Sequence, residues 1–246
     1  MKIGVVQMSL SESLELNTRR ILEWVRLALE RDVAVLGFPE TALSGYLFEG
    51  FSSQEHAAVR RAVDEVHGAL RGSGLHLVLG TPWLEGGALY NSAAVLFPDG
   101  SRALYHKNHL VDYENRFFTA GTQSLVFQVR GHAMGVIICR DQNFPRACGE
   151  LARAGARGVF ICAAHYYPLR ESRLKRVKNT ALPIARAYEN NLFVFKANAV
   201  GTTRGRVSLG GSLIVDPAGI VAQEAGEHEE ALLAYDIDFS KPNPSW

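Results

Sequence analysis

One segment of the chain combines a strand, a polar turn and the start of a helix: Gly135-Val136-Ile137-Ile138-Cys139-Arg140-Asp141-Gln142-Asn143-Phe144-Pro145-Arg146. Its apolar, β-branched beginning is typical of a buried strand. Pro145 suits the first turn of a helix, where its missing N–H costs no hydrogen bond. Cys139 is therefore predicted at the carboxyl end of a strand, where the neighbouring helix N-terminus would favour a thiolate. A lone cysteine is more often a packing residue, so the rest of the chain has to distinguish the two interpretations.

The composition argues against several classes of protein. Of the 246 residues, 47% are hydrophobic and 21% are charged, as in an ordinary globular protein with a large core. A net charge of +1 gives no reason to expect a nucleic-acid or membrane partner. No apolar run reaches the roughly 18–20 residues of a membrane span. The three cysteines, and a strand-like run directly after Met1-Lys2, predict a cytoplasmic chain without disulfides or a targeting peptide.

The first third of the chain alternates strands and helices. Apolar runs predict strands over residues 3–7, 33–38 and 75–79. Apolar residues at helical spacing predict helices around 21–29 and 59–70. This βαβαβ order predicts a sheet covered by helices.

The rest of the chain adds hairpins to this pattern. Three are predicted, pairing residues 90–97 with 102–105, 125–129 with 133–139, and 208–215 with 220–223. Further strands are expected at 159–163, 192–197 and 231–237, and helices at 146–156 and 169–189. Because no linker or repeat interrupts the chain, we expect one α/β domain over residues 1–246, with two sheets packed face to face.

Three ionisable residues directly follow apolar strands. Glu40 follows the strand at 33–38, Lys107 the strand at 102–105, and Cys139 the apolar run at 136–138. Ligand sites of open α/β sheets gather beyond the carboxyl ends of the strands. A single Glu or Lys in such a place is usually a solvated loop residue, so it is the set of three that indicates a site.

Six groups of motifs resemble those of the nitrilase superfamily of carbon–nitrogen hydrolases, in the same order along the chain. They are Phe38-Pro39-Glu40 with Gly45-Tyr46, Tyr90-Asn91-Ser92 with Pro98-Asp99-Gly100, Lys107-Asn108-His109-Leu110, Ile138-Cys139-Arg140-Asp141 with Phe144-Pro145, Ala185-Arg186-Ala187-Tyr188-Glu189-Asn190, and Asp216-Pro217 with Gly219. Together they extend from Gln7 to about Ile237, and six motifs in register are highly specific.

The resemblance implies a four-layer αββα sandwich of two mixed β-sheets flanked by helices. It also implies a catalytic triad of Glu40, Lys107 and Cys139, with Glu114 as a supporting glutamate. The alternative for Glu114 is an exposed loop acid. We expect no cofactor and no metal. Members of the superfamily usually form homodimers or larger homo-oligomers through helices near the site, and the apolar tail at 243–246 is a candidate contact.

The implied activity is hydrolysis of a non-peptide carbon–nitrogen bond of a small amide through a Cys139 thioester, with release of ammonia or an amine. A thiol with a pKa near ~8.5 needs a base to attack an amide, and Glu40 is the expected base. Lys107 and the backbone N–H of Arg140 would bind the oxyanion. The lysine charge would also keep both glutamates ionised.

The chain departs from the usual motif at Arg146, where an acid is common, and at Arg140, directly after the nucleophile. Arg146 would pair with a nearby carboxylate or contact a partner chain. For Arg140 two interpretations remain: its side chain binds a substrate carboxylate, or it forms a structural ion pair. We favour the second. Asp141 is expected to be a structural hydrogen-bond acceptor.

Substrate selection is expected from the loops around these residues, at 46–51, 112–118, 142–143 and 165–167. The candidate pocket residues are Tyr46, Asn143, His165 and Tyr166, with Tyr167 as an alternative to Tyr166. Asn143, four residues after Cys139, is a feature of branches that act on small aliphatic amides.

Several other functions remain open at this stage. His106 and His109 could belong to a metal site or a Cys–His hydrolase, although no third metal ligand is evident and neither explains the other motifs. A nitrile or an N-carbamoyl compound could replace the amide as substrate. The chain could also be a catalytically silent homologue that binds a metabolite.

Overall fold

The computed structural model describes residues 1–46 and 53–239. Its helices are α1 (Leu14–Glu30), α2 (Ser53–Gly68), α3 (Pro145–Arg153) and α4 (Leu169–Asn190), with short 3-10 turns η1 (Glu114–Arg116) and η2 (Cys139–Asn143). The strands are β1 (Lys2–Ser9), β2 (Val35–Gly37), β3 (His76–Glu85), β4 (Ala88–Leu96), β5 (Arg102–His106), β6 (Leu125–Val129), β7 (His132–Ile138), β8 (Gly158–Ala163), β9 (Phe193–Thr203), β10 (Arg206–Ser208), β11 (Leu213–Val215), β12 (Val221–Glu224) and β13 (Ala231–Asp236).

The strands form two sheets that share a seam. One has the order β5-β4-β3-β2-β1-β13 and the other β6-β7-β8-β9-β11-β12. Strands β1 and β9 join them by parallel pairing at Met8 with Ala199 and Ser9 with Val200. Each sheet is mixed, since β1, β2 and β3 run parallel, as do β7, β8 and β9, while the hairpin strands run antiparallel. The predicted pair of mixed sheets is confirmed.

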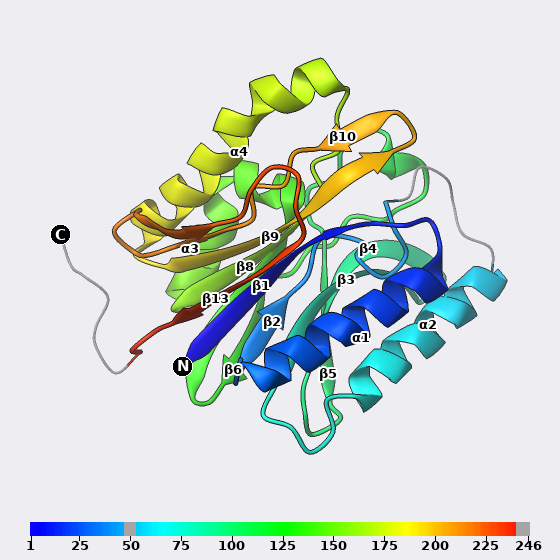
Figure 1. Cartoon of the computed structure of the whole chain (residues 1–246), viewed down its shortest axis with the longest axis horizontal. Coiled ribbons are helices and arrows are strands. Elements are labelled where there is room, and N and C mark those ends of the chain that lie inside the picture. The colour runs from blue at the N-terminus through cyan, green and yellow to red at the C-terminus, as the bar shows by residue number, and fades with distance from the viewer. Residues whose placement is uncertain (47–52, 240–246) are drawn as a thin grey trace.

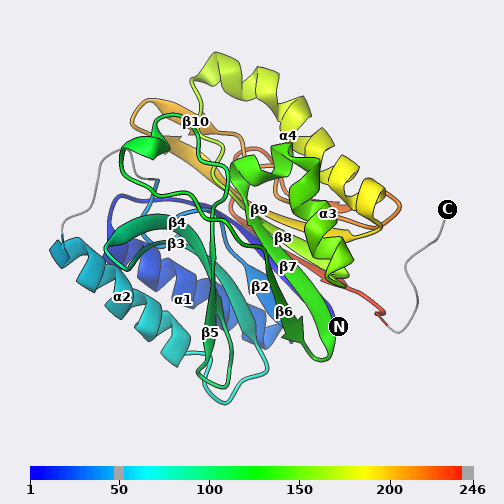
Figure 2. The same cartoon turned by 180° about the vertical axis from the view of Figure 1, so that it is seen from behind.

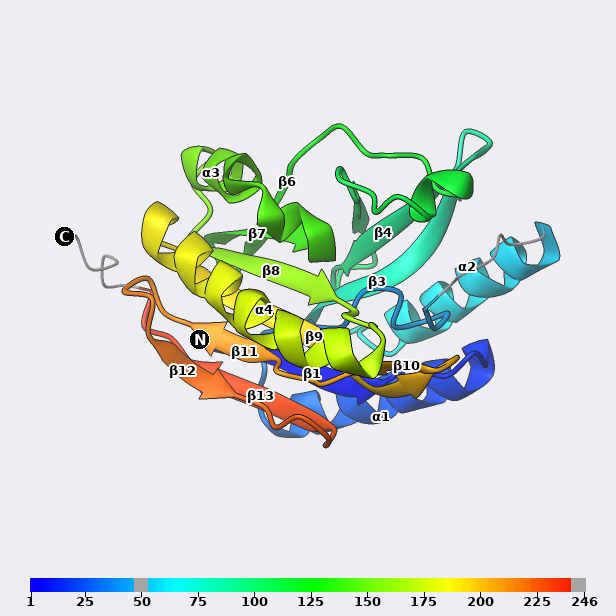
Figure 3. The ribbon, with the colours of Figure 1, turned by 90° about the horizontal axis from the view of Figure 1, so that it is seen from above.

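Alternation of side chains along the strands makes three cores and four layers. Val5, Val35 and Val78 of the first sheet meet Val136 and Phe160 of the second in the central core. Their sequence neighbours face outward, either under α1 and α2 or under α3 and α4. Figure 1 and Figure 2 show the two helix pairs on opposite sides of the strands, and Figure 3 shows the layers from above. This is the expected αββα sandwich.

Two predicted strands differ from the structure. The strand predicted at 75–79 extends to Glu85 and turns through Gly86-Gly87 into β4, which makes a hairpin that the apolar pattern did not reveal. The single strand predicted at 208–215 is wrong. Gly210 and Gly211 both have positive φ, so the chain bends there and forms β10 and β11 instead, and β10 pairs with an extended β9.

The helix predictions are better matched. Pro145 is the first residue of α3, as expected, and α4 covers the predicted 169–189. Among residues 1–46 and 53–239, no helix has both the length and the apolar character needed to cross a membrane.

Candidate active site

The three strand-end residues come together between the sheets. Lys107 Nζ lies 2.6 Å from Glu40 Oε1 and 2.9 Å from Glu114 Oε1. All three side chains are at least 98% buried, so these ion pairs are shielded from solvent. Glu114 is therefore no exposed loop acid. A buried ammonium between two carboxylates is held in place by charge-assisted hydrogen bonds.

The Asn91 amide completes this cluster. Its Nδ2 donates to Glu40 Oε1 at 2.8 Å and to Glu114 Oε1 at 3.1 Å, and the backbone carbonyl of Asn91 accepts the backbone N–H of Lys107. The second oxygens of the carboxylates accept backbone N–H groups, from Ala164 for Glu40 and from Val111 for Glu114. Both glutamates and the lysine thus have fixed orientations.

The charges of the cluster shift its own pKa values. Burial acts to lower the pKa of Lys107, but the Glu40 and Glu114 carboxylates outweigh it, so the pKa is raised and the ammonium persists. Burial raises the pKa of the Glu114 carboxyl in spite of Lys107. The lysine charge does act to lower the pKa of this glutamate, as expected, but burial outweighs it, so the net shift of the pKa is upward.

Cys139 occupies a sharp turn at the end of β7. Its φ is +46°, a left-handed conformation that is uncommon for a residue with a side chain, while Ile138 before it is extended. As a whole residue Cys139 is half-buried, in contrast to the buried Cys148 and Cys162. The turn presents the thiol to Glu40 and Lys107, whose charges both act on it.

The expectation of a Cys139 thiolate is wrong. Burial and the Glu40 carboxylate raise the pKa of the thiol well above its ordinary value, and Lys107 opposes them only in part. The α3 helix begins at Pro145, six residues further on, with η2 in between. The residue therefore rests as a thiol, and a base has to remove its proton before the sulfur can attack a substrate.

Asp141 connects the two segments that carry Cys139 and Lys107. Its Oδ2 accepts the Ile138 backbone N–H at 3.0 Å and the Tyr105 hydroxyl at 2.7 Å. Its Oδ1 accepts the backbone N–H of His109 and lies 2.8 Å from the Nδ1 of the same residue. The expected role as a structural acceptor agrees with these contacts.

The arginines near the nucleophile form ion pairs at the surface. Arg140 Nη1 lies 3.5 Å from Asp112 Oδ1, and Arg146 Nε lies 2.6 Å from Glu150 Oε1. The first contact fits the structural interpretation of the Arg140 side chain. Exposed pairs of this kind contribute little stability.

His106 and His109, which the sequence offered for a metal site or a Cys–His hydrolase, have other partners. The His106 ring contacts Ser92 and Glu85, and the His109 ring contacts Asp141 and stacks on Phe144. Within residues 1–46 and 53–239, no three His, Cys, Asp or Glu side chains are grouped so as to hold a metal ion.

Three tyrosine side chains lie close to one another near the buried Glu40–Lys107–Glu114 cluster. The Tyr46 ring lies 6.3 Å from Tyr113 and 5.7 Å from the buried Tyr166. Burial, then the Glu40 and Glu114 carboxylates, raises the pKa of Tyr113, so this phenol lies near the Glu40–Lys107–Glu114 cluster. Most of the predicted pocket loop at 46–51, and the tail at 243–246, lie outside the described residues.

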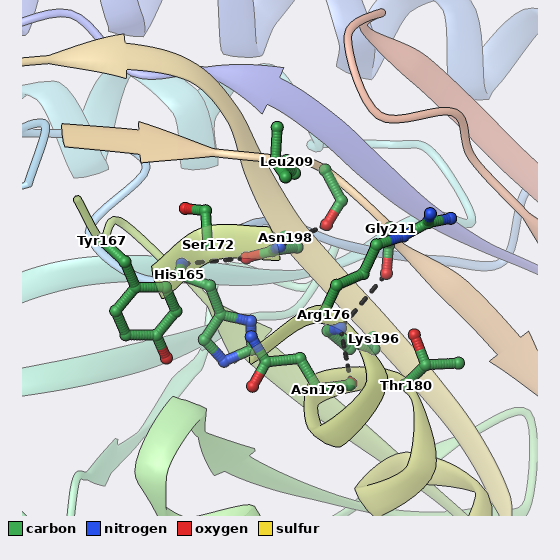
Figure 4. A pocket seen from close by; sticks show the side chains of 11 residues that line it. His165, Tyr167, Ser172, Arg176, Asn179, Thr180, Lys196, Asn198, Leu209 and Gly211 are labelled. Carbon is green, nitrogen blue, oxygen red and sulfur yellow. Dashed lines mark hydrogen bonds between the residues drawn. The ribbon is translucent and has the colours of Figure 1, made fainter. Parts of the chain in front are cut away.

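The other pocket candidates, Asn143 and His165, lie in or beside the turn η2 that begins at Cys139. Asn143 is exposed, whereas Gln142 before it is buried with Nε2 3.2 Å from His165 Nε2. His165 and Tyr167 line a cavity of about 20 Å³ with Asn179, Lys196 and others (Figure 4). Burial, then the nearby Lys196 charge, lowers the pKa of His165 well below its ordinary value, so its ring is neutral.

The sequence indicated Asn91 only as part of a motif and Tyr113 only as part of the loop at 112–118, without a role for either side chain. Asn91 is a polar residue in a strand of mainly apolar, buried residues, and this could have indicated a function because buried amides need partners. Tyr113 belongs to an irregular loop, where no periodicity shows which side chains face inward.

Comparison with known proteins places this geometry in context. A family model described as carbon–nitrogen hydrolase matches residues 2–242. An (R)-stereoselective amidase of Pseudomonas sp. is 33% identical over 220 residues, with 85% of this chain and 76% of that protein covered. A nitrilase of Pyrococcus abyssi is 32% identical, with 97% and 90% covered.

Solved structures agree with these relatives. A mutant amidase of Nesterenkonia AN1, from the nitrilase superfamily, superposes with a TM-score of 0.87 at 27% identity and covers 98% of this chain and 91% of its own. In another mutant of the same amidase, acrylamide has added to the active-site cysteine. The resemblance derived from the motifs is thereby confirmed.

Proposed function

Because this chain belongs to the carbon–nitrogen hydrolase family, and is a cysteine-dependent hydrolase of amide bonds, we propose that Glu40, Lys107 and Cys139 are its catalytic triad, with Glu114 in support. The observation that carries the proposal is the buried Glu40–Lys107–Glu114 cluster, whose charges act on the Cys139 thiol.

The first half of the reaction acylates Cys139. Glu40 takes the thiol proton as the sulfur attacks the amide carbon, and a tetrahedral oxyanion forms. The Lys107 ammonium and the Arg140 N–H stabilise that charge. Glu40 then gives the proton to the amide nitrogen, the carbon–nitrogen bond breaks, and ammonia leaves a thioester on Cys139.

The second half releases the acid. Glu40, again a carboxylate, removes a proton from water, whose oxygen attacks the thioester carbon. The same two donors hold the second oxyanion. When it collapses, the carbon–sulfur bond breaks, Glu40 returns its proton to the sulfur, and the carboxylic acid departs.

Glu114 and Asn91 act through Lys107 and Glu40 as positioning residues. One Glu114 oxygen accepts from both the ammonium and the Asn91 amide, and Asn91 also reaches Glu40. The lysine is thus confined to one position and kept charged, as oxyanion stabilisation requires.

The proposed substrates are small, mainly aliphatic amides. The wall formed by Tyr46, Tyr113 and Tyr166 is aromatic, and it would limit the acyl group by size. Nitriles are the second candidate, favoured by the 32% identity to a nitrilase; Cys139 would then attack the nitrile carbon to give a thioimidate. N-carbamoyl compounds are the third.

A screen of amides, nitriles and N-carbamoyl acids for ammonia release tests the function. We expect ammonia release from small amides. When the reaction is quenched rapidly, the intact mass of the protein should be increased by the mass of the acyl group minus one hydrogen, because the acyl group replaces the thiol hydrogen of Cys139. Cys139→Ala should lose both signals because no other residue supplies the nucleophile. Near-normal turnover by Cys139→Ala would refute the mechanism, and turnover of nitriles alone would select the second candidate.

We further propose that residues 1–246 form one catalytic domain that assembles as a homodimer or larger homo-oligomer and works in the cytoplasm. Exposed apolar residues on α4 support the assembly: Leu174 is 70% exposed and Val177 76%. Tyr188 near the end of the same helix and Ile220 are also exposed, and the loop at Gly219 lies against Tyr188. An exposed surface of this kind commonly marks a protein contact.

A further inference from the structure

Strand β9 contains a buried lysine without an acidic partner. Lys196 lies between Phe195 and Ala197 of the central core, and its own side chain is on the opposite face, toward α4. It is 1% exposed, and among the described residues no carboxylate lies within ion-pair distance of its Nζ. Burial lowers its pKa to about 8. Burying an amine costs free energy unless its N–H groups donate hydrogen bonds. The groups that accept from Lys196 Nζ therefore indicate what this buried lysine does.

The first partner is a helix carbonyl that Pro183 leaves without a donor. Pro183 lies inside α4, and proline has no N–H to give to the carbonyl four residues earlier. That carbonyl belongs to Asn179, and Lys196 Nζ donates to it at 2.9 Å. A second bond of 3.2 Å goes to the carbonyl of Gly211 (Figure 4). Lys196 thus supplies from the sheet the donor that the helix lacks.

The second half of α4 is connected to the nucleophile turn. Arg186, one turn after Pro183, is 4% exposed, and its Nε donates to the Gln142 carbonyl at 2.9 Å. Gln142 is in η2, three residues after Cys139. The position of α4 around Pro183 therefore determines where Arg186 holds the turn that contains Cys139.

We propose that Lys196 is a positioning residue for the hydrolysis: by satisfying the carbonyl opposite Pro183, it seats α4 so that Arg186 fixes the turn of Cys139. The proposal rests on the proposed function only in that Cys139 is the nucleophile. A neutral lysine amine still has two N–H groups, so both bonds form whether or not the side chain is charged.

A double-mutant cycle with Pro183 tests this role. Lys196→Met keeps the length of the side chain and removes both donors. We expect it to lower kcat about 10- to 100-fold with KM changed less than about twofold, because small displacements of a nucleophile act mainly on the chemical step. Pro183→Ala returns a backbone N–H to the Asn179 carbonyl and should leave kcat near the wild-type value.

The decisive measurement is Lys196→Met in the Pro183→Ala background. There the helix supplies its own donor, so most of the lost kcat should return, and the two changes should be non-additive. Equal losses in both backgrounds would overturn the proposal, as would a wild-type kcat for Lys196→Met. If Lys196→Met alone does not fold, we still expect the double variant to fold and to hydrolyse the amide. A double variant that does not fold, or that is inactive, would also refute the positioning role of Lys196.

Two controls separate this result from others. Lys178→Met removes a lysine from the exposed face of the same helix and should leave kcat and KM unchanged. Cys139→Ala tests the proposed function independently: its retained turnover would refute the nucleophile assignment, whereas additivity in the Lys196–Pro183 cycle would refute only the positioning role.

Discussion

The thiol of Cys139 lies between opposite charges, and its reactivity should report them separately. The Glu40 carboxylate raises the pKa of the thiol, and the Lys107 ammonium lowers it. Glu40→Gln removes the negative charge, so the pKa should fall and the thiolate fraction at a given pH should rise, about tenfold for each unit. We expect faster alkylation of Cys139 by iodoacetamide at pH 8, together with loss of amide turnover.

Removal of the positive charge of Lys107 provides the control for this prediction. Lys107→Met removes the ammonium, so the pKa of Cys139 should rise and alkylation should slow, again with loss of turnover. The rate would be followed by peptide mass mapping, which distinguishes Cys139 from the buried Cys148 and Cys162. Slower alkylation in Glu40→Gln than in the wild type would contradict this charge arrangement.

Single site residues were predictable where a charged or nucleophilic side chain comes directly after an apolar strand. Glu40, Lys107 and Cys139 could be chosen because a charged or nucleophilic residue after an apolar run stands out in the sequence, and the motifs supported the choice. The resting protonation state of Cys139 could not be predicted, since it depends on a carboxylate 99 positions earlier in the chain. The acceptor function of Asp141 was predictable, but not its three partner residues.

At the scale of elements, β3 lies against the turn that carries Glu40, and a glycine permits this contact. A Cβ on Gly80 would lie 2.1 Å from the Pro39 carbonyl oxygen and 2.8 Å from Glu40 Cα, both rigid backbone atoms. Gly80→Ala should therefore displace the Glu40 turn, lower kcat by at least about tenfold, and lower the free energy of unfolding by about 1–3 kcal/mol. Ammonia release and urea unfolding would measure the two effects.

Gly68 is the matched control for Gly80→Ala. No atom lies within 4 Å of the position of its Cβ, and it ends α2 far from the triad in sequence. Gly68→Ala should leave kcat unchanged and unfolding unaffected or slightly more costly, because alanine restricts the unfolded chain. If Gly80→Ala behaved in the same way, the close contact would have no functional consequence.

The elements show where local patterns are sufficient and where they are not. Helix α4 was predicted within a residue of its bounds because its periodicity and the terminal Asn190-Asn191 agree. The β3–β4 hairpin was missed because Gly80, Thr81 and Pro82 interrupt the apolar run, which therefore predicted a strand only to residue 79. The single strand predicted at 208–215 ignored two consecutive glycines, whose positive φ redirects the chain.

At the scale of the whole molecule, the four layers bring distant segments to one site. Glu40 comes from the first sheet, as does Lys107, while Cys139 comes from the second. The number of layers follows from strands that are apolar on both faces. The seam between β1 and β9 was not predictable, since two residue pairs leave no pattern in the sequence.

The outer surface of α4 gives the last prediction, which concerns assembly. If Leu174 and Val177 lie in a contact between copies of the chain, Val177→Asp should bury a charge there and shift the protein toward monomer. Light scattering after size exclusion, at several protein concentrations, would measure the molar mass. Leu29→Asp provides the control, because Leu29 is an exposed leucine, 39% accessible, on α1 at the opposite face. An unchanged mass for Val177→Asp, or a monomeric wild-type protein, would show that this surface does not join the copies.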